Sequence, residues 1–262
     1  MLKMPLIGLG TWKLYAEECE STVKTALELG YRHIDTADEY QNHEAIGRAI
    51  KSFPRNELYL TTKVAVHELL PNQVEAAVPR FLKELQTDYI DLLLIHWPNP
   101  NVDLVETLKT MISFQKQGLI RSIGISNFVR FHLEMLAPYQ FPILTNQIEL
   151  HPYLQRRSLV ALCKKMGITV TAYRPLAKGA FEQDPILQEI GKVHGKSASQ
   201  VALRWLIEQD IAAIPKAASL QHMKDNLDIF DFKLSPSEML QIEKLDQGKR
   251  FCAPAGMPIF ED

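Results

Sequence analysis

The stretch HIDTADEYQN, residues 33–42, has the pattern of one strand–helix unit. A short apolar run leads into Asp35, a loop carrying Tyr40 follows, and a helical pattern comes next. Chains that repeat such units fold into α/β proteins with a parallel sheet. The rest of the sequence therefore has to be searched for the same unit.

The unit recurs along the whole chain. Eight short β-rich runs alternate with helical patterns: PLIGLG (5–10), RHIDTA (32–37), LYLTTKV (58–64), IDLLLIH (90–96), IRSIGIS (120–126), ILTNQI (143–148), ITVTAY (168–173) and IAAIPK (211–216). Eight strands in 262 residues predict an α/β protein, a (β/α)8 TIM barrel with a single domain over residues 1–262. The alternative is an open doubly wound sheet, but Gly8-Leu9-Gly10 is not the G-x-G-x-x-G turn that such a sheet uses for a dinucleotide.

Two helical segments have clear signals. Residues 16–29 place Cys19, Val23, Ala26 and Leu27 on one face, and residues 197–209 open with serines suited to capping. Pro79 lies inside the pattern over 72–86, which predicts that this helix starts late or kinks there.

Composition narrows the class of protein. The net charge is -2 and no segment is strongly basic, so we expect neither nucleic acid nor an anionic membrane as the main partner. Cys19, Cys163 and Cys252 are scattered and have no metal-site spacing, so we expect reduced thiols and no metal site. No apolar run approaches the ~20 residues of a membrane span. MLKMPLIGLG does not have the architecture of a signal peptide, so we expect a mature cytoplasmic protein.

The carboxyl ends of the predicted strands are polar or aromatic, and in a barrel these ends surround the active site. In chain order they are Thr11 with Trp12, Asp35, Lys63, His96, Ser126 with Asn127, Asn146 with Gln147, Tyr173 with Arg174, and Lys216. Each alone has an ordinary structural explanation; Ser126-Asn127, for example, could cap the next helix. Together they have the groups needed for proton transfer at a carbonyl.

The expected chemistry centres on Tyr40. Lys63 beside it would lower the pKa of the phenol from about 10, because an ammonium group favours phenolate. Asp35 would hold Lys63 in place, and His96 would donate a hydrogen bond to the carbonyl oxygen. Tyr40 is then the general acid. Spacing alone does not identify the hydride source.

At these residues the sequence resembles the aldo-keto reductases. GLGTW (8–12), GYRHIDTADEY (30–40), SIGISNF (122–128) and IPKAASLQHMKDN (214–226) are similar to family motifs and occur in the family's order. DLLLIHWP and NQIELHP are also similar. Within the family the chain looks most like the bacterial 2,5-diketo-D-gluconate reductases, especially their B form, which are also described as methylglyoxal reductases.

The resemblance implies an NADP(H)-dependent reductase and assigns roles by position. The catalytic tetrad would be Asp35, Tyr40, Lys63 and His96. Trp12 and Trp97, with Tyr40 and His96, would line the substrate pocket. The cofactor would contact Thr11, Asp35, Ser126, Asn127, Gln147, Tyr173, the loop of Arg174, Pro175, Leu176, Lys178 and Gly179, and then Lys216, Ala217, His222 and Asn226.

Four positions depart from the family pattern. Arg174 and Ala217 replace serines, His222 replaces an arginine, and His43 replaces a glutamate. Ala217 and His222 weaken the expected grip on the 2′-phosphate of NADP(H), so cofactor preference is open.

The sequence also leads to expectations about the substrate class and the oligomeric state. Short loops after His96 and Tyr173, and a tail beyond Leu245 too brief to fold far over the mouth, predict an open site for a small polar carbonyl, such as a 2-oxoaldehyde or keto-sugar acid. The resemblance suggests a monomer. Three other functions stay open: a Schiff-base aldolase using Lys63, a non-enzymatic NADP(H)-binding regulatory subunit, and a sugar-phosphate isomerase barrel.

Overall fold

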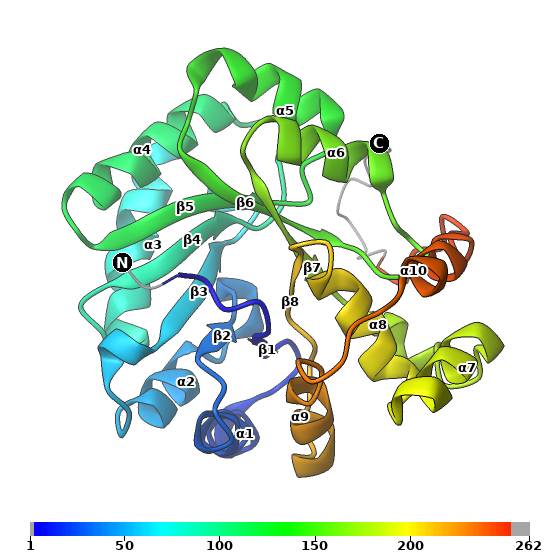
Figure 1. The fold of residues 1–262 in the computed structure, drawn as a ribbon. Coiled ribbons are helices and arrows are strands. Elements are labelled where there is room, and N and C mark those ends of the chain that lie inside the picture. Colours follow the sequence, from blue (N-terminus) through cyan, green and yellow to red (C-terminus); the bar gives the residue numbers. More distant parts are fainter. Residues whose placement is uncertain (1–2, 253–262) are drawn as a thin grey trace.

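The computed structural model describes residues 3–252. Its eight strands form one sheet in the order β1 to β8, and each pairs in parallel with the next (Figure 1). Their bounds are β1 Leu9–Gly10, β2 His33–Asp35, β3 Tyr59–Val64, β4 Ile90–Ile95, β5 Ile120–Ser126, β6 Ile143–Glu149, β7 Thr169–Tyr173 and β8 Ala212–Ala213. Each strand lies within or beside a predicted run, so the predicted alternation is confirmed.

The first and last strands close the sheet into a barrel. Ile7 and Ala213 form a parallel bridge, and Ala213 N donates to Leu6 O at 2.7 Å while Gly8 N donates to Ala213 O at 2.9 Å. The backbones approach so closely that a Cβ at Gly10 would lie 2.7 Å from Ile214 O. This closure excludes the open doubly wound alternative.

The helices lie around the outside of the sheet (Figure 1). They are α1 Ala16–Glu28, α2 His43–Ile50, α3 Pro71–Glu84, α4 Leu104–Lys116, α5 Arg130–Leu136, α6 Arg157–Lys165, α7 Pro185–His194, α8 Ala198–Ile207, α9 Leu220–Leu227 and α10 Pro236–Glu243. The expected helices over 16–29 and 197–209 are confirmed as α1 and α8, and Ser197 caps α8 by accepting from Gln200 N. None of the helices in residues 3–252 has both the length and the apolar character to cross a membrane.

Helix α3 contradicts one of the two outcomes predicted for Pro79, the late start. It begins at Pro71 and includes Pro79, so a late start is wrong. Val74, Ala77 and Val78 are buried on the same helix. Their packing against the core offsets the backbone hydrogen bond that a proline cannot make.

Side chains alternate between the two sides of the barrel wall with the period of two expected for strands. On β4, Leu93 and Ile95 join the large core beneath the helices, whereas Leu92 and Leu94 belong to a separate cluster with Tyr59. The same alternation carries Lys63 on β3 and Asp35 on β2 to the inner side, where they meet. His96 follows Leu92 and Leu94 in this alternation, one residue beyond β4.

Candidate active site

Asp35 and Lys63 form a buried ion pair at the carboxyl ends of β2 and β3. Lys63 Nζ donates to Asp35 Oδ1 at 2.5 Å and to Thr36 O at 2.8 Å, and Gln147 Nε2 donates to Asp35 Oδ2 at 2.7 Å. The Lys63 and Asp35 side chains are 1% and 2% exposed. Burial lowers the pKa of Lys63, while the charge of Asp35 opposes that shift. Two buried charges are tolerated here because each has a charged partner and further hydrogen bonds.

Tyr40 and His96 lie above this pair. Their rings meet edge to face with centroids 5.7 Å apart. Tyr40 comes from a short 3-10 turn, Asp38–Tyr40, and Glu39 of that turn places Oε2 2.7 Å from His96 Nδ1. One turn therefore carries both the proposed acid and a partner for the proposed hydrogen-bond donor.

The expected lowering of the Tyr40 pKa is wrong in this structure. Burial raises the pKa of Tyr40 well above its ordinary value, and the charges of Asp35 and Glu39 act in the same direction. Lys63 Nζ lies 5.2 Å from the centre of the Tyr40 ring and is paired with Asp35. The ammonium group is therefore paired with a carboxylate whose own charge raises the pKa of the phenol.

A second row of polar side chains joins β5, β6 and β7. Ser126 Oγ donates to Gln147 O at 2.8 Å, Asn127 Nδ2 donates to His96 O at 3.0 Å, and the Tyr173 hydroxyl donates to Asn127 Oδ1 at 2.8 Å. Ser126-Asn127 is not the helix cap considered from sequence, because α5 begins at Arg130 with Val129 as its N-cap residue. These residues instead bind the strand ends to one another.

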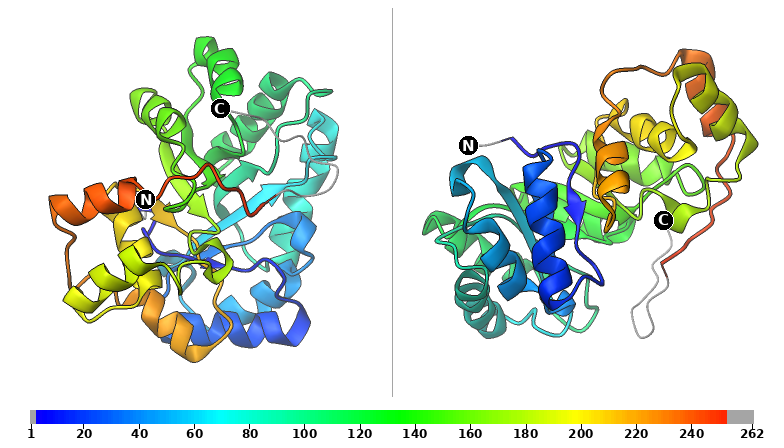
Figure 2. Two further views of the ribbon diagram at one scale, coloured as in Figure 1. Left: turned by 90° about the vertical axis from the view of Figure 1, so that its right-hand side faces the viewer. Right: turned by 90° about the horizontal axis from the view of Figure 1, so that it is seen from below.

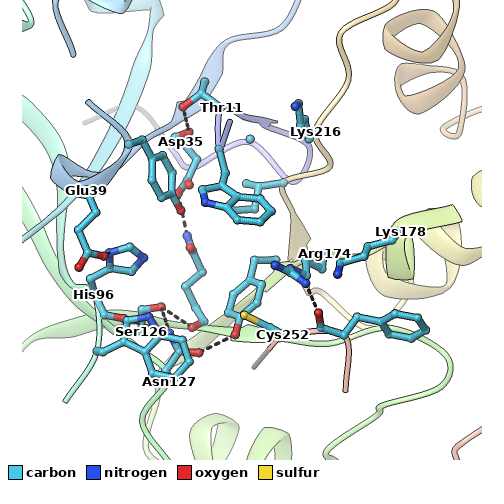
Figure 3. A pocket seen from close by; sticks show the side chains of 18 residues that line it. Thr11, Asp35, Glu39, His96, Ser126, Asn127, Arg174, Lys178, Lys216 and Cys252 are labelled. Carbon is cyan, nitrogen blue, oxygen red and sulfur yellow. Dashed lines mark hydrogen bonds and ion pairs between the residues drawn. The ribbon is translucent and has the colours of Figure 1, made fainter. Parts of the chain in front are cut away.

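A cavity of about 430 Å³ opens above these residues (Figure 3). Asp35, Tyr40, His96, Trp12 and Trp97 line it together with Ser126, Asn127, Gln147, Tyr173 and Thr11. Lys63 is not among the lining residues. The predicted catalytic, substrate and second-row residues therefore meet at one place, with Lys63 beneath them.

A larger cavity of about 870 Å³ adjoins the first. Both are lined by Trp12, Arg174, Lys178 and Lys216. The second alone is lined by Pro175, Leu176, Gly179, His222 and Asn226, among others. The buried Nδ2 of Asn226 makes no hydrogen bond within the described part of the chain.

Two predicted cofactor contacts are placed less favourably. Ala217 is 2% exposed and lines neither cavity. Thr11 lines the first cavity, but its hydroxyl donates to Asp35 O at 2.9 Å. Ala217 has no polar side-chain group, and the Thr11 hydroxyl already donates its hydrogen to Asp35 O. Neither side chain therefore offers a hydrogen-bond donor to a phosphate.

Comparison with known proteins agrees with this geometry. A sequence model of the aldo/keto reductase family matches residues 6–247. The chain belongs to the aldo/keto reductase family. The resemblance inferred from the motifs is confirmed, and with it an oxidoreductase that acts on carbonyl compounds.

Two relatives and one solved structure are similar to this chain over more than nine-tenths of its length. The chain is 42% identical to methylglyoxal reductase DkgA of Escherichia coli (strain K12) over 255 residues, covering 94% of this chain and 91% of the relative. It is 40% identical to methylglyoxal reductase DkgB of Escherichia coli O157:H7 over 262 residues, covering 98% of each. A solved structure assigned as a 2,5-diketo-D-gluconic acid reductase B superposes with a TM-score of 0.95 at 38% identity, covering 99% of this chain and 94% of the other.

Two residues of the tail beyond Leu245, Phe251 and Cys252, take part in the site of this aldo/keto reductase, although that tail was expected to be too brief to fold far over the mouth. Phe251 N and Cys252 N donate to the two oxygens of Glu149 at 2.6 and 3.0 Å, and Arg174 donates to Phe251 O. Phe251 and Cys252 line the first cavity. The left view of Figure 2 shows the segment after α10, in red, crossing the barrel. The remaining tail, residues 253–262, lies outside the described residues.

Sequence reasoning missed Glu39, Phe251 and Cys252 as cavity residues. A signal existed for Glu39, because it precedes Tyr40 directly and carries a charge. No local signal marks Phe251, since its place depends on Glu149, 102 residues earlier in the chain.

A second charged cluster lies on the rim of the reductase. Arg80 donates to both oxygens of Asp38 at 2.6 and 3.1 Å and to Glu68 Oε2 at 2.7 Å. His43 places Nδ1 2.9 Å from Glu84 Oε2 and Nε2 2.8 Å from Thr62 Oγ1. Arg80 supplies the positive charge that these carboxylates need.

Proposed function

We propose that this reductase uses NADPH to reduce a small polar aldehyde or ketone to the alcohol, with Tyr40 as the proton donor. The substrate class would be a 2-oxoaldehyde or a keto-sugar acid such as 2,5-diketo-D-gluconate. The observation that carries the proposal is the junction of the two cavities. Tyr40 and His96 stand in one, and cationic side chains border the other.

The residues present fit NADP(H). A dinucleotide needs a place for its nicotinamide next to the reacting carbonyl and a separate, cationic place for its phosphates. Lys178 and Lys216 border both cavities, and His222 and Asn226 lie farther along the second. Ser126, Asn127, Gln147 and Tyr173 would hold the nicotinamide end in the first cavity.

The bound cofactor would supply the hydride. Tyr40 would deliver its hydroxyl proton to the carbonyl oxygen, so that hydride and proton together give the alcohol. His96 would donate a hydrogen bond to the same oxygen and orient it. Lys63 would act from below the cavity floor through its fixed ion pair with Asp35, since Asp35 lines the cavity and Lys63 does not.

Three features support a small polar substrate. The first cavity is about 430 Å³ and includes the region in which we place the nicotinamide, so little of that volume is left for a substrate. Arg174 and Lys178 lie on its border and could attract a carboxylate. Two relatives are named methylglyoxal reductases, and the superposed structure is assigned to a keto-acid reductase.

The aldolase alternative is not supported by the position of Lys63. A Schiff-base lysine must reach a carbonyl in the cavity with a neutral amine. Lys63 is 1% exposed, lies outside the cavity lining and is paired with Asp35. The monomeric state and cytoplasmic location stay predictions from the sequence.

The test is oxidation of NADPH, and of NADH in parallel, with methylglyoxal, a keto-sugar acid and a bulky apolar ketone. We expect kcat/KM to be higher with NADPH and with the two polar substrates. A bulky ketone preferred by tenfold or more would overturn the substrate class, and a preference for NADH would overturn the cofactor.

A further inference from the structure

Glu39 is an acidic side chain that lies directly against His96. Its Oε2 lies 2.7 Å from His96 Nδ1, and the two side chains are 26% and 11% exposed. The contact has the distance of an ion pair but not the alignment of a hydrogen bond, and Nδ1 of His96 has no hydrogen-bond partner in the described part of the chain. Figure 3 shows one ring nitrogen of His96 toward Glu39 and the other toward the cavity.

An acceptor oxygen this close to Nδ1 favours a hydrogen on that ring nitrogen. A carboxylate can only accept hydrogen bonds, so the nitrogen beside it, Nδ1, is the one that holds a hydrogen. A neutral imidazole has a single N–H, which leaves Nε2 as an acceptor. Nε2 can then donate to a carbonyl oxygen only when the ring is doubly protonated.

The groups around His96 set the pH up to which its ring keeps a second proton. His96 is faced by Glu39 and Tyr40 from the 3-10 turn, by Asp35 from β2 and by Lys63 from β3. Burial lowers the pKa of His96 below its ordinary value, Glu39 opposes that shift, and Lys63 reinforces it. The contact with His96 in turn lowers the pKa of Glu39, which keeps that side chain an acceptor.

We propose that Glu39 is a positioning residue that makes carbonyl reduction depend on a protonated Glu39–His96 pair. Reduction then weakens as pH rises, because the pair loses the proton that Nε2 would offer to the substrate. The inference rests on the reductase activity proposed above. In this proposal, Glu39 determines the pH range over which the enzyme reduces carbonyl compounds.

The substitution that tests this is Glu39→Gln. An amide can donate its N–H to Nδ1, which leaves the hydrogen of a neutral ring on Nε2. With methylglyoxal as the probe, wild-type kcat/KM should fall about tenfold per pH unit above the pair's pKa. The Glu39→Gln profile should be flat over the same range and should exceed wild type at its upper end.

The matched control is Glu44→Gln. Glu44 is an exposed carboxylate on α2, so its loss changes the net charge equally without touching His96. Its pH profile should follow wild type. Coinciding profiles for wild type and Glu39→Gln would overturn the inference, and so would a flat profile in Glu44→Gln.

A second measurement is independent of activity. Nitrogen-15 NMR of histidine-labelled wild type, with the His96 signals assigned from a His96→Gln sample, reports which nitrogen is protonated. We expect the neutral ring to carry its hydrogen on Nδ1 in wild type and on Nε2 in Glu39→Gln. A neutral wild-type ring protonated on Nε2 would disprove the inference, whereas a wild type that reduces no carbonyl at any pH would disprove the proposed function instead.

Discussion

Asp35 and Asp38 stand three residues apart in one short stretch, yet they form ion pairs of different kinds. The Asp35–Lys63 pair has side chains 2% and 1% exposed, whereas Asp38 and Arg80 are 13% and 38% exposed. The first pair sits beneath Tyr40, and the second spans the rim between the 3-10 turn and α3.

The difference shows that surroundings, more than the residue type, decide what an ion pair does. Inside the barrel a lost partner leaves a charge that water cannot solvate, so the pair is indispensable even if its net contribution is small. On the rim, water and salt screen the charges, and the pair contributes little. The four predictions below test this contrast and are ordered by the size of the expected effect.

Tyr40→Phe should have the largest effect, because it removes the proton donor that stands above the buried pair. We expect kcat for methylglyoxal reduction to fall about 10²–10⁴-fold, the usual range for loss of a general acid. NADPH affinity, measured by fluorescence titration, should stay within a few-fold of wild type. A variant that keeps more than a tenth of the wild-type rate would remove Tyr40 from the proposed role.

Lys63→Met compared with Arg80→Met tests the two pairs directly. Lys63→Met leaves Asp35 as a buried, unpaired charge and should lower the free energy of unfolding by about 3–5 kcal/mol. Arg80→Met should cost about 1 kcal/mol or less. Urea denaturation of the cofactor-free protein measures both.

The double variant Asp35→Asn/Lys63→Met is the control for the larger effect. It removes both buried charges and should recover part of the stability that Lys63→Met loses. Equal losses in Lys63→Met and Arg80→Met would contradict the contrast between barrel and rim.

The rim pair should respond to salt and acid. Burial alone would raise the pKa of Asp38, but its bonds to Arg80 outweigh that and hold the pKa below its ordinary value. A lowered carboxyl pKa stabilises the fold above the unfolded value of about 3.9, and this contribution is lost as pH falls through the folded value. The difference in melting temperature between wild type and Arg80→Met should therefore be present at neutral pH and shrink below about pH 4. It should also shrink in 1 M NaCl, where the Debye length is about 3 Å.

The smallest effect is expected at His222, an exposed residue that lines the second cavity. His222→Arg introduces an arginine, whose planar group binds a phosphate with two hydrogen bonds. Because the site is open to water, we expect the ratio of kcat/KM for NADPH to that for NADH to rise only about twofold to fivefold. The values with NADH are the internal control; an unchanged ratio would place His222 away from the 2′-phosphate.

The fold was predictable because its signals are local and repeated. Eight β-rich runs with helical patterns between them need only the alternation of short segments to be recognised. The predicted late start of α3 was wrong because it considered only the low helix propensity of Pro79. The burial of Val74, Ala77 and Val78 on the same helix could not be included at that stage. The gathering of Asp35, Tyr40 and His96 at one cavity also followed from sequence, since parallel strands end at the same edge.

The sequence by itself determined the barrel, the family and the residues that meet at its mouth, since each depends on short patterns in a set order. Tertiary structure alone decided how those residues act on one another. The Asp35–Lys63 pair was expected from the sequence, but only the folded barrel shows that it is buried and that Lys63 is not free to act on Tyr40. The fold also placed Glu39 against His96, 57 positions away, and brought Phe251 to Glu149. Such contacts join distant parts of the chain, and burial then sets their electrostatic strength, which no local pattern can express.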